Sequence, residues 1–496
     1  MRPQVFRPLP DDDNPKSEPD TDMSHWRLLP SFLILWSCAS APPPRMVPDV
    51  VPEGWATRID TSQVLGQWWL TFDDSLAVQL VQEALVNNHT MQIAAANVAA
   101  ARAQARIVGA ARLPQASATS SGSRSQRNFI GFPIPSAAGQ VQSTTSTSYT
   151  ADVAVSWELD LWGRLRSSHS AALADLQAVE ADWYGVRQSL AAQTLRAYFA
   201  CVEAQRQVRL AEATVESYET STSRVESRYE RGLRPALDLL LARTSLSSAE
   251  ASLHRRRLQL DSAIRQLELL VGRYPAGVLQ PGSRLPTVQG SVPAGLPAEL
   301  IGRRPDLAAA ERRLAASDAR VQEARRALYP RISLTASGGR SSSELADLLD
   351  GDFSVWNLVG NITQPLFQGG RLRAGIDLSE ANADRAVITY AQTALRAFAE
   401  VESGLAAEGL LAEQVAALTT ASAVSTDARI VADQRYAKGL TDLLTMLTSQ
   451  RTAFDAESRL LAVQRQRLDT RIDLHLALGG GFAQDADARA TTRDTP

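Results

Sequence analysis

The stretch Arg228-Tyr229-Glu230-Arg231-Gly232-Leu233 decides the fold, because it returns 207 positions later as Arg435-Tyr436-Ala437-Lys438-Gly439-Leu440. Other stretches recur in the same order at offsets of 207, 200 and 216: Gly163-Arg164-Leu165-Arg166 with Gly370-Arg371-Leu372-Arg373, Leu195-Arg196-Ala197-Tyr198 with Leu395-Arg396-Ala397-Phe398, and Pro114 and Gly122 with Pro330 and Gly338. The offsets 207 and 200 differ by seven residues, which is one heptad, so the heptad pattern of a coiled coil stays in register between the copies. Self-similarity at a nearly fixed spacing marks a duplicated unit. We therefore expect two copies of one plan of roughly 210 residues.

Each copy is expected to contain one very long helix and one return helix. No proline interrupts the 67 residues from Gly163 to Tyr229 or the 66 residues from Arg371 to Tyr436. At 1.5 Å per residue, each stretch gives roughly 100 Å of helix. The first return helix is expected to start at Pro235. Large apolar residues then recur at every seventh position: Leu239, Leu246, Leu253, Leu260 and Leu267 in the first copy, and Leu440, Leu447, Phe454, Leu461 and Leu468 in the second. Sustained heptads predict coiled-coil packing.

Alternation of apolar and polar residues predicts two strands in each copy. It is clearest over residues 149–161, present over 332–337 and 356–362, and least regular over 116–125. No segment after the N-terminal apolar run holds 18 apolar residues in succession, so a membrane-inserted chain would have to use a closed β-barrel. A soluble four-stranded sheet packed on the helices is the alternative.

Four strands cannot close a membrane barrel, since single-chain bacterial barrels have eight or more. Two copies would give eight strands with an interior filled by side chains, whereas three copies would give twelve strands and room for a lumen. We therefore predict a homotrimer. The expected fold class is mainly α with a membrane β-barrel: a long α-helical coiled-coil barrel plus four β-strands per protomer, forming a trimeric twelve-stranded barrel.

The N-terminus predicts a lipid anchor at Cys38. This residue ends a short apolar run, Leu28 to Trp36, which is too short to span a membrane and has the size of a secretory signal core. Leu35-Trp36-Ser37-Cys38 resembles a bacterial lipoprotein cleavage box, and Met23 is a better start than Met1 because it leaves a short charged region. The residue after the cysteine is Ala39 rather than an aspartate, which in a bacterial lipoprotein would imply sorting to the outer membrane. A cytosolic chain with a stray apolar N-terminus is the alternative.

Composition excludes several classes of function. Apolar residues make up 44% and charged residues 21% of the 496 residues, which excludes a disordered chain. The net charge of −3 gives no electrostatic footprint for nucleic acid. Neither a phosphate-binding glycine loop nor a Gly-x-Ser-x-Gly motif is present, so we expect no enzyme. The five histidines lack ligand spacing, so we expect no metal: His25, His89, His169, His254 and His475. We expect no cofactor apart from covalent lipid on Cys38, and we expect Cys201 to be a small buried residue.

Four sequence motifs resemble those of a known family, the outer-membrane efflux lipoproteins of tripartite resistance-nodulation-division pumps. These proteins are TolC-type channels. The resemblance covers about residues 38 to 482. The motifs that carry it are Trp68-Trp69-Leu70-Thr71-Phe72-Asp73-Asp74, Glu158-Leu159-Asp160-Leu161-Trp162-Gly163-Arg164, Arg303-Arg304-Pro305-Asp306-Leu307 and Gln364-Pro365-Leu366-Phe367-Gln368-Gly369-Gly370-Arg371. His89 stands where the second copy has Pro305, which puts only a helix start in doubt.

The resemblance implies a trimeric exit duct that passively exports drugs or other small amphipathic solutes. Its partners would be outer-membrane lipid, a periplasmic adaptor (membrane fusion) protein and an inner-membrane pump. The implied segments are a signal peptide (1–37), an N-terminal equatorial segment (38–72), the first repeat (73–270), an equatorial connection (271–297), the second repeat (298–478) and a C-terminal tail (479–496). A type I secretion duct shares this fold and is one alternative. A lipid-anchored coiled-coil tether of the envelope is another.

The resemblance also places two candidate sites. The hairpin tips are expected to contact the adaptor through Arg231, Gly232, Leu233, Lys438, Gly439 and Leu440. A periplasmic gate is expected at Asp442, Leu444 and Thr448, where Asp442 would supply a ring of carboxylates and Leu444 an apolar ring. Many relatives have aspartate at the position of Thr448, so an acidic ring is missing there. For the tips, the alternative is a purely structural helix cap; for the gate residues, it is ordinary helix surface.

Overall fold

The structure, a computed structural model, describes residues 52, 54–56, 67–130, 141–287, 290, 292, 295 and 297–480. All of these belong to one compact unit of the chain, which starts at Val47. Met23, Cys38 and the predicted signal peptide lie outside the described residues. The predictions made for them therefore stay predictions.

The element order confirms the duplication. The first copy consists of η1 (Trp68–Phe72), α1 (Ser75–Asn87), α2 (His89–Ala110), β1 (Gln115–Phe129), β2 (Gln142–Leu159), α3 (Arg164–Glu230) and α4 (Ala236–Leu270). The second consists of α5 (Pro297–Arg303), α6 (Pro305–Arg326), β3 (Arg331–Ser342), η2 (Ala346–Leu349), η3 (Gly351–Phe353), β4 (Ser354–Thr363), α7 (Arg371–Ala437) and α8 (Leu443–Ala477). Both long helices have 67 residues, and both return helices have 35. His89 and Pro305 each begin their helix, so the departure from the motif does not shift that start.

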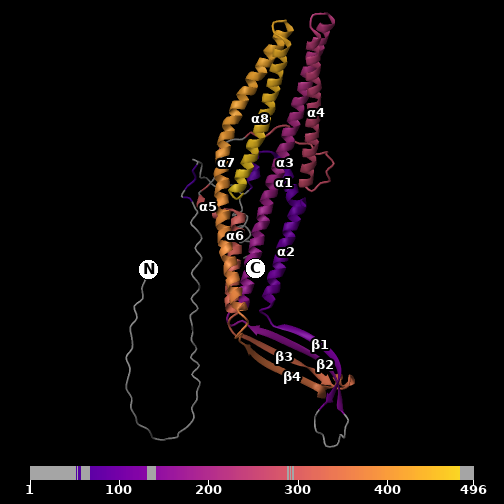
Figure 1. The fold of residues 1–496 in the computed structure, drawn as a ribbon, viewed down its shortest axis with the longest axis vertical. Helices are drawn as coiled ribbons and strands as arrows, with labels where there is room; N and C mark the ends of the chain where they lie inside the picture. The colour runs from indigo at the N-terminus through magenta and orange to yellow at the C-terminus, as the bar shows by residue number, and fades with distance from the viewer. Residues whose placement is uncertain are drawn as a thin grey trace, which may run out of the picture. The chain divides into compact units, whose positions relative to one another are not determined.

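The helices form two antiparallel hairpins, α3 with α4 and α7 with α8 (Figure 1). The predicted heptads hold them together, since Leu239, Leu253 and Leu267 of α4 are buried, as are Leu447, Leu461 and Leu468 of α8. Two details of the prediction were wrong. Pro235 has an extended backbone and precedes α4, and Leu440 is exposed in the turn before α8, because the chain reverses over residues 438–442.

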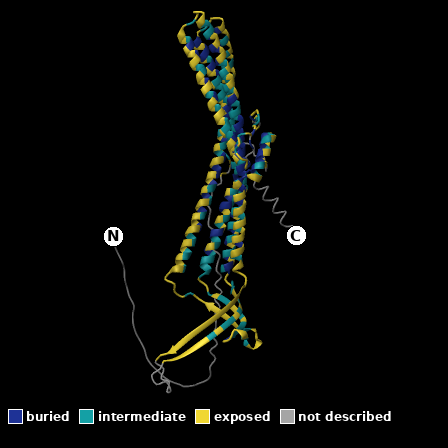
Figure 2. Cartoon of the chain, turned by 90° about the vertical axis from the view of Figure 1, so that its right-hand side faces the viewer, coloured by how far each residue is buried: buried dark blue, intermediate teal, exposed yellow. Residues whose placement is uncertain are grey.

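The four strands form one antiparallel sheet in the order β1-β2-β3-β4. The strands are longer than predicted: β2 begins at Gln142 and β1 extends from Gln115 to Phe129, because their serine- and threonine-rich halves pair through backbone hydrogen bonds. Both outer strands are exposed along their whole lengths, and Figure 2 shows the sheet projecting from the ends of the helices. The sheet is thus not packed on the helices, which contradicts the soluble-sheet alternative.

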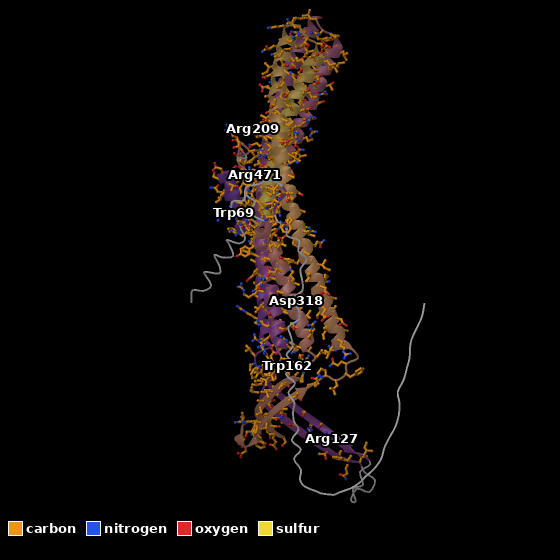
Figure 3. All side chains as sticks on the ribbon, turned by 90° about the vertical axis from the view of Figure 1, so that its left-hand side faces the viewer. Trp69, Arg127, Trp162, Arg209, Asp318 and Arg471 are labelled. Carbon is orange, nitrogen blue, oxygen red and sulfur yellow. The ribbon has the colours of Figure 1, made fainter. Side chains whose placement is uncertain are left out.

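The junction between sheet and helices is fixed by two side chains of the first copy, one of which bonds to the backbone of the second. Asp160 accepts hydrogen bonds from the backbone N–H groups of Leu165 (3.0 Å) and Arg166 (2.7 Å) and so caps the start of α3. The indole N–H of Trp162 donates to the carbonyl oxygen of Pro330 (2.8 Å), at the start of the second pair of strands. Figure 3 shows Trp162 where the helices meet the sheet. These bonds set the direction in which the sheet leaves the helices.

An aromatic cluster lies halfway along α3, where α1, η1 and the end of α8 meet. Trp68 is fully buried, donates from its indole N–H to Gln188 (2.9 Å), and stacks on His475 with ring centroids 5.3 Å apart. Burial lowers the pKa of His475 to about 4, so its ring is neutral in the folded chain. Cys201 is buried in the same cluster, as predicted, and burial raises the pKa of its thiol to about 12. The cluster is structural.

The buried carboxylate of Glu268 anchors the connection that follows α4. It accepts hydrogen bonds from three successive backbone N–H groups, those of Gly277 (2.7 Å), Val278 (2.8 Å) and Leu279 (3.0 Å). Burial alone would raise the pKa of this carboxyl, but the three donors outweigh burial, and the net pKa lies below its ordinary value. The ionised form therefore stabilises the fold.

We expect Glu268→Gln to destabilise the chain by at least about 1.5 kcal/mol, because hydrogen bonds to a charged acceptor are lost. This contribution is fully present above the unfolded-state pKa of about 4.3 and is lost as the pH falls through the lower folded-state pKa. Thermal unfolding in detergent between pH 3 and 8 measures it. Asp261→Asn, which removes only an exposed ion pair with Arg265, is the matched control. Equal melting temperatures for the two variants at neutral pH would contradict this role.

Candidate functional site: the hairpin tips and the two faces of the sheet

Both hairpin tips are closed by the same glycine turn. In the first, Gly232 N–H donates to the Tyr229 carbonyl (2.7 Å) and Leu233 N–H donates to the Arg228 carbonyl (2.8 Å). The second repeats this pair of bonds from Gly439 and Leu440, at 3.0 and 2.8 Å. This is the Schellman motif, which needs a left-handed residue; φ is 70° at Gly232 and 76° at Gly439. The capping alternative therefore accounts for both glycines.

The turn geometry also exposes an apolar side chain at each tip. Leu233 and Leu440 are 67% and 63% exposed, and the long polar side chains of Arg231 and Lys438 next to them are exposed as well. No atom lies within 4 Å of a Cβ placed on either glycine. All six predicted tip residues are therefore accessible from outside the chain. Each tip thus presents an exposed apolar side chain next to a cationic group.

The two tips are joined by a contact that the sequence motifs did not predict. The Arg228 guanidinium donates to the carbonyl oxygens of Tyr436 (3.2 Å) and Ala437 (2.7 Å). Arg228 and Arg234 also lie 5.0 and 5.4 Å from the centroid of the Tyr436 ring. Tyr436 is 1% exposed, whereas its counterpart Tyr229 is 42% exposed. The only available signal was the repeated Arg-Tyr pair, which does not show that one copy contacts the other.

The predicted gate residues lie at the start of α8, one before the helix and two in its first turns. Asp442 precedes the helix, and its carboxylate accepts hydrogen bonds from the backbone N–H (2.7 Å) and hydroxyl (3.0 Å) of Thr445. These bonds hold the pKa of Asp442 below its ordinary value. Leu444 and Thr448 are exposed on one face, while Leu443, Met446 and Leu447 are buried. Asp442 is thus the N-cap of α8, and the exposed apolar residue Leu444 follows it in the first turn.

The sheet has one apolar and one mostly polar face. Residues that pair across the ladder share a face, and three successive rows on one side are Trp157-Leu334-Gly360, Val155-Ala336-Leu358 and Val153-Gly338-Trp356. The intervening rows carry Ser156-Thr335-Val359 and Ala154-Ser337-Asn357 on the other side. The large apolar side chains are exposed to the outside of the chain. A two-faced exposed sheet of this kind is typical of membrane strands.

Neither a cluster of metal ligands nor a membrane-spanning helix occurs in the described ranges. No group of three or more histidine, cysteine, aspartate or glutamate side chains there could hold a metal ion. Within the same ranges, no helix is both long and apolar enough to cross a membrane.

Long hairpins with exposed tips and a two-faced sheet define the class of protein: an outer-membrane channel. The chain belongs to the outer membrane efflux protein family, whose model matches residues 80–273 and 296–480. It is 36% identical over 415 residues to the solvent efflux pump outer membrane protein SrpC of Pseudomonas putida, covering 83% of this chain and 87% of that protein. It is 36% identical over 462 residues to outer membrane protein OprJ of Pseudomonas aeruginosa, covering 91% and 94%.

A solved structure of an outer membrane channel has the same fold. The CmeC outer membrane channel of Campylobacter jejuni superposes with a TM-score of 0.82 at 25% identity, covering 88% of this chain and 93% of that channel. The family resemblance, the fold class and the efflux function predicted from the sequence are therefore confirmed. The protein is an outer-membrane efflux channel protein. The roles of Cys38, the tips and the gate residues stay predictions.

Proposed function

We propose that the chain is the exit duct of a tripartite efflux pump, working as a lipid-anchored homotrimer in the outer membrane. The exposed, two-faced sheet carries this proposal. Its outer strands β1 and β4 each have an unpaired backbone edge, which a partner subunit must cover. Three copies joined edge to edge would close a twelve-stranded barrel with the apolar face toward lipid. Small amphipathic solutes would leave through its polar interior, driven by an inner-membrane pump.

We expect deletion of the gene to lower the inhibitory concentrations of solvents or amphipathic antibiotics at least several-fold, since the pump then lacks its exit. Plasmid-borne wild type restores them, and Cys38→Ala protein lacks the added mass of a lipid on its N-terminal peptide. Broth dilution and mass spectrometry of the membrane fraction measure the two effects. Unchanged susceptibility, with loss of a secreted protein instead, would favour the type I secretion alternative. An unlipidated Cys38 in wild type would contradict the anchor.

The hairpin tips would form the adaptor-binding rim. Two leucines per chain, Leu233 and Leu440, give six exposed apolar side chains in a trimer. The adaptor would cover these side chains, and the adjacent Arg231 and Lys438 would pair with acidic groups at the edge of the contact. The short turns hold the leucines at fixed positions, which reduces the entropy lost on binding.

We expect Leu233→Asp with Leu440→Asp to reduce adaptor crosslinking at least tenfold, because charged groups would replace the apolar contact. Neither substitution disturbs the backbone, since both side chains are exposed. Leu349→Asp, at a leucine between β3 and β4 that is more exposed still, is the control and should leave crosslinking unchanged. Site-specific photo-crosslinking in cells, with channel abundance measured in parallel, provides the readout. Wild-type crosslinking by the double variant would contradict the rim.

The gate would lie at the start of α8, where three copies bring Asp442 and Leu444 around one axis. Asp442 would supply a ring of three carboxylates and Leu444 an apolar ring. The Arg228 and Arg234 contact with Tyr436 fixes this hairpin against the first one. The rings would therefore widen only if the hairpins moved apart.

We expect Asp442→Asn to lower cation selectivity in planar bilayers, because the charge is removed while the side-chain oxygen still caps the helix. Asp442→Ser is the matched control for the cap and should show the same loss of selectivity. We expect Leu444→Ser to raise conductance several-fold by hydrating the constriction. If all three variants conduct with wild-type selectivity and amplitude, these residues do not form the gate.

A further inference from the structure

A cavity lies halfway along the long helices, where both of them change packing partners. Helix α8 packs against α3 and α7 over one half of their length, and α6 packs against them over the other half (Figure 1). The end of α8 at Ala477 and the start of α6 at Pro305 border a cavity of about 960 Å³ between α3 and α7. This volume suits a drug-sized organic molecule.

Gly185 of α3 borders this cavity, and no packing contact requires a glycine there. Within a helix, glycine is less favourable than alanine. A Cβ placed on Gly185 would meet Pro305 at 3.8 Å, which is an ordinary van der Waals contact. The backbone of Gly185 does not have a positive φ either. What the missing side chain provides is therefore room inside the cavity.

Four carboxylates, one from each of the helices α3, α6, α7 and α8, border the cavity. They are Asp182, Asp306, Glu400 and Asp473. The arginines that pair with them are three, namely Arg196, Arg304 and Arg313. The cluster thus has one more negative than positive charge. Glu400 and Asp473 each meet an arginine through one oxygen, Oε2 and Oδ1, so their other oxygen atoms remain as acceptors for a ligand.

The floor of the cavity combines apolar side chains with an unused hydrogen-bond donor. Leu190 and Gln188 both border the cavity and are buried. Gln188 is 3% exposed, and its Oε1 atom accepts a hydrogen bond from Trp68 (2.9 Å). Its Nε2 group has no hydrogen-bond partner within the described part of the chain. Buried polar groups are rarely left in this state, so an acceptor from a bound molecule would satisfy it.

We propose that this cavity is a binding site for an amphipathic organic cation. The apolar body of the solute would lie against Leu190 and Gly185, its protonated amine among the carboxylates, and an acceptor oxygen at Nε2 of Gln188. A metal ion is a poorer occupant, because no group of three or more acidic, histidine or cysteine side chains in the described ranges could hold one. The proposal rests on the efflux duct proposed above and names a solute site within it.

The mouth of the cavity lies on the side of α3 that faces away from the aromatic cluster. Leu195 packs in that cluster, whereas the exposed residue Gln193 borders the cavity. Two residues along a helix correspond to a turn of about 200°. The cluster carries η1 and α1 as an additional layer on the wall. In a tube of three chains, this layer has room only on the outside, so the cavity would open into the duct.

The balance of charges suits a site from which a solute must leave again. Three of the four carboxylate charges are neutralised by arginines, so the cavity attracts a cation without holding it tightly. Conduction requires binding that favours entry but still permits release. The cavity would therefore retain a solute briefly on its way through the duct.

The test is binding of doxorubicin, a fluorescent amphipathic amine, to the purified full-length protein in lipid nanodiscs. Fluorescence anisotropy, corrected for empty nanodiscs, measures the affinity. We expect Gly185→Leu to lower the affinity at least tenfold, because the added side chain would occupy the cavity. Gly185→Ala is the matched control and should keep wild-type affinity, since its methyl group fits beside Pro305. Ser403→Leu, at an exposed position on the α7 side of the cavity, should act like Gly185→Leu and replaces it if that variant does not fold.

The charge of the ligand is tested separately. We expect Asp473→Asn to weaken doxorubicin binding several-fold, because it removes a carboxylate from the cavity. Glu216→Gln, at an exposed carboxylate of α3 outside the cavity, is the control and should have no effect. Fluorescein, an anionic dye, should bind far more weakly than doxorubicin. Equal binding of the two dyes, or equal doxorubicin affinity of wild type and both leucine variants, would overturn the proposal.

Drug susceptibility of cells that carry the same variants separates this site from the duct itself. If the chain exports drugs but the wild-type protein binds no doxorubicin, the site is contradicted and the duct stands. If the wild-type protein binds doxorubicin in the cavity but deletion of the gene leaves susceptibility unchanged, the site is supported and the duct is contradicted.

Discussion

The lengths of the helices impose the constraint on which the rest of the structure depends. The long helices α3 and α7 have 67 residues, whereas the return helices α4 and α8 have 35, so each return helix covers only about half of its partner. The uncovered halves must be packed by other segments, and α2 and α6, of 22 residues each, take that place. The half of α3 that packs on α4 meets the half that packs on α2 and α6 at the middle of the helix. The aromatic cluster around Trp68 and the loop held by Glu268 lie there, because the chain must change layers at that point.

The two copies cover each other on one side only. The matching surfaces on the other side of each copy are exposed. Tyr436 is enclosed by the first hairpin, while its counterpart Tyr229 is exposed. Helix α6 packs on both long helices, α3 and α7, whereas α2 packs mainly on α3. The sheet ends in two unpaired strands, β1 and β4. In each case a contact between the two copies is formed once within the chain, and the equivalent surface of the other copy has no such contact. The homotrimer proposed above would cover all three by repeating one heterologous contact.

Sequence periodicity predicted those features that repeat locally. The 67-residue helices, the buried leucines of α4 and α8 and the glycine turns follow from proline-free length, heptads and the αL preference of glycine. The ends of β1 and β2 were missed because serine and threonine carry no alternation signal, although their backbone pairs well. Contacts between the copies were missed for another reason. The pairing of Arg228 with Tyr436, and of Arg320 with Asp175, joins residues more than 140 positions apart, and no local pattern encodes such a pair.

At the start of α8, one carboxylate caps the helix and would also serve the gate proposed above. The first N–H groups of α8 need an acceptor, and the side chain of Asp442 supplies one to Thr445. The same bonds stabilise the ionised carboxylate, because the donors point at its oxygen atoms and lower its pKa. A charge fixed in this way cannot swing away from the turn without uncapping the helix. Any movement of the charge therefore requires movement of the hairpin itself, and the tie between Arg228 and the carbonyls of Tyr436 and Ala437 resists that movement.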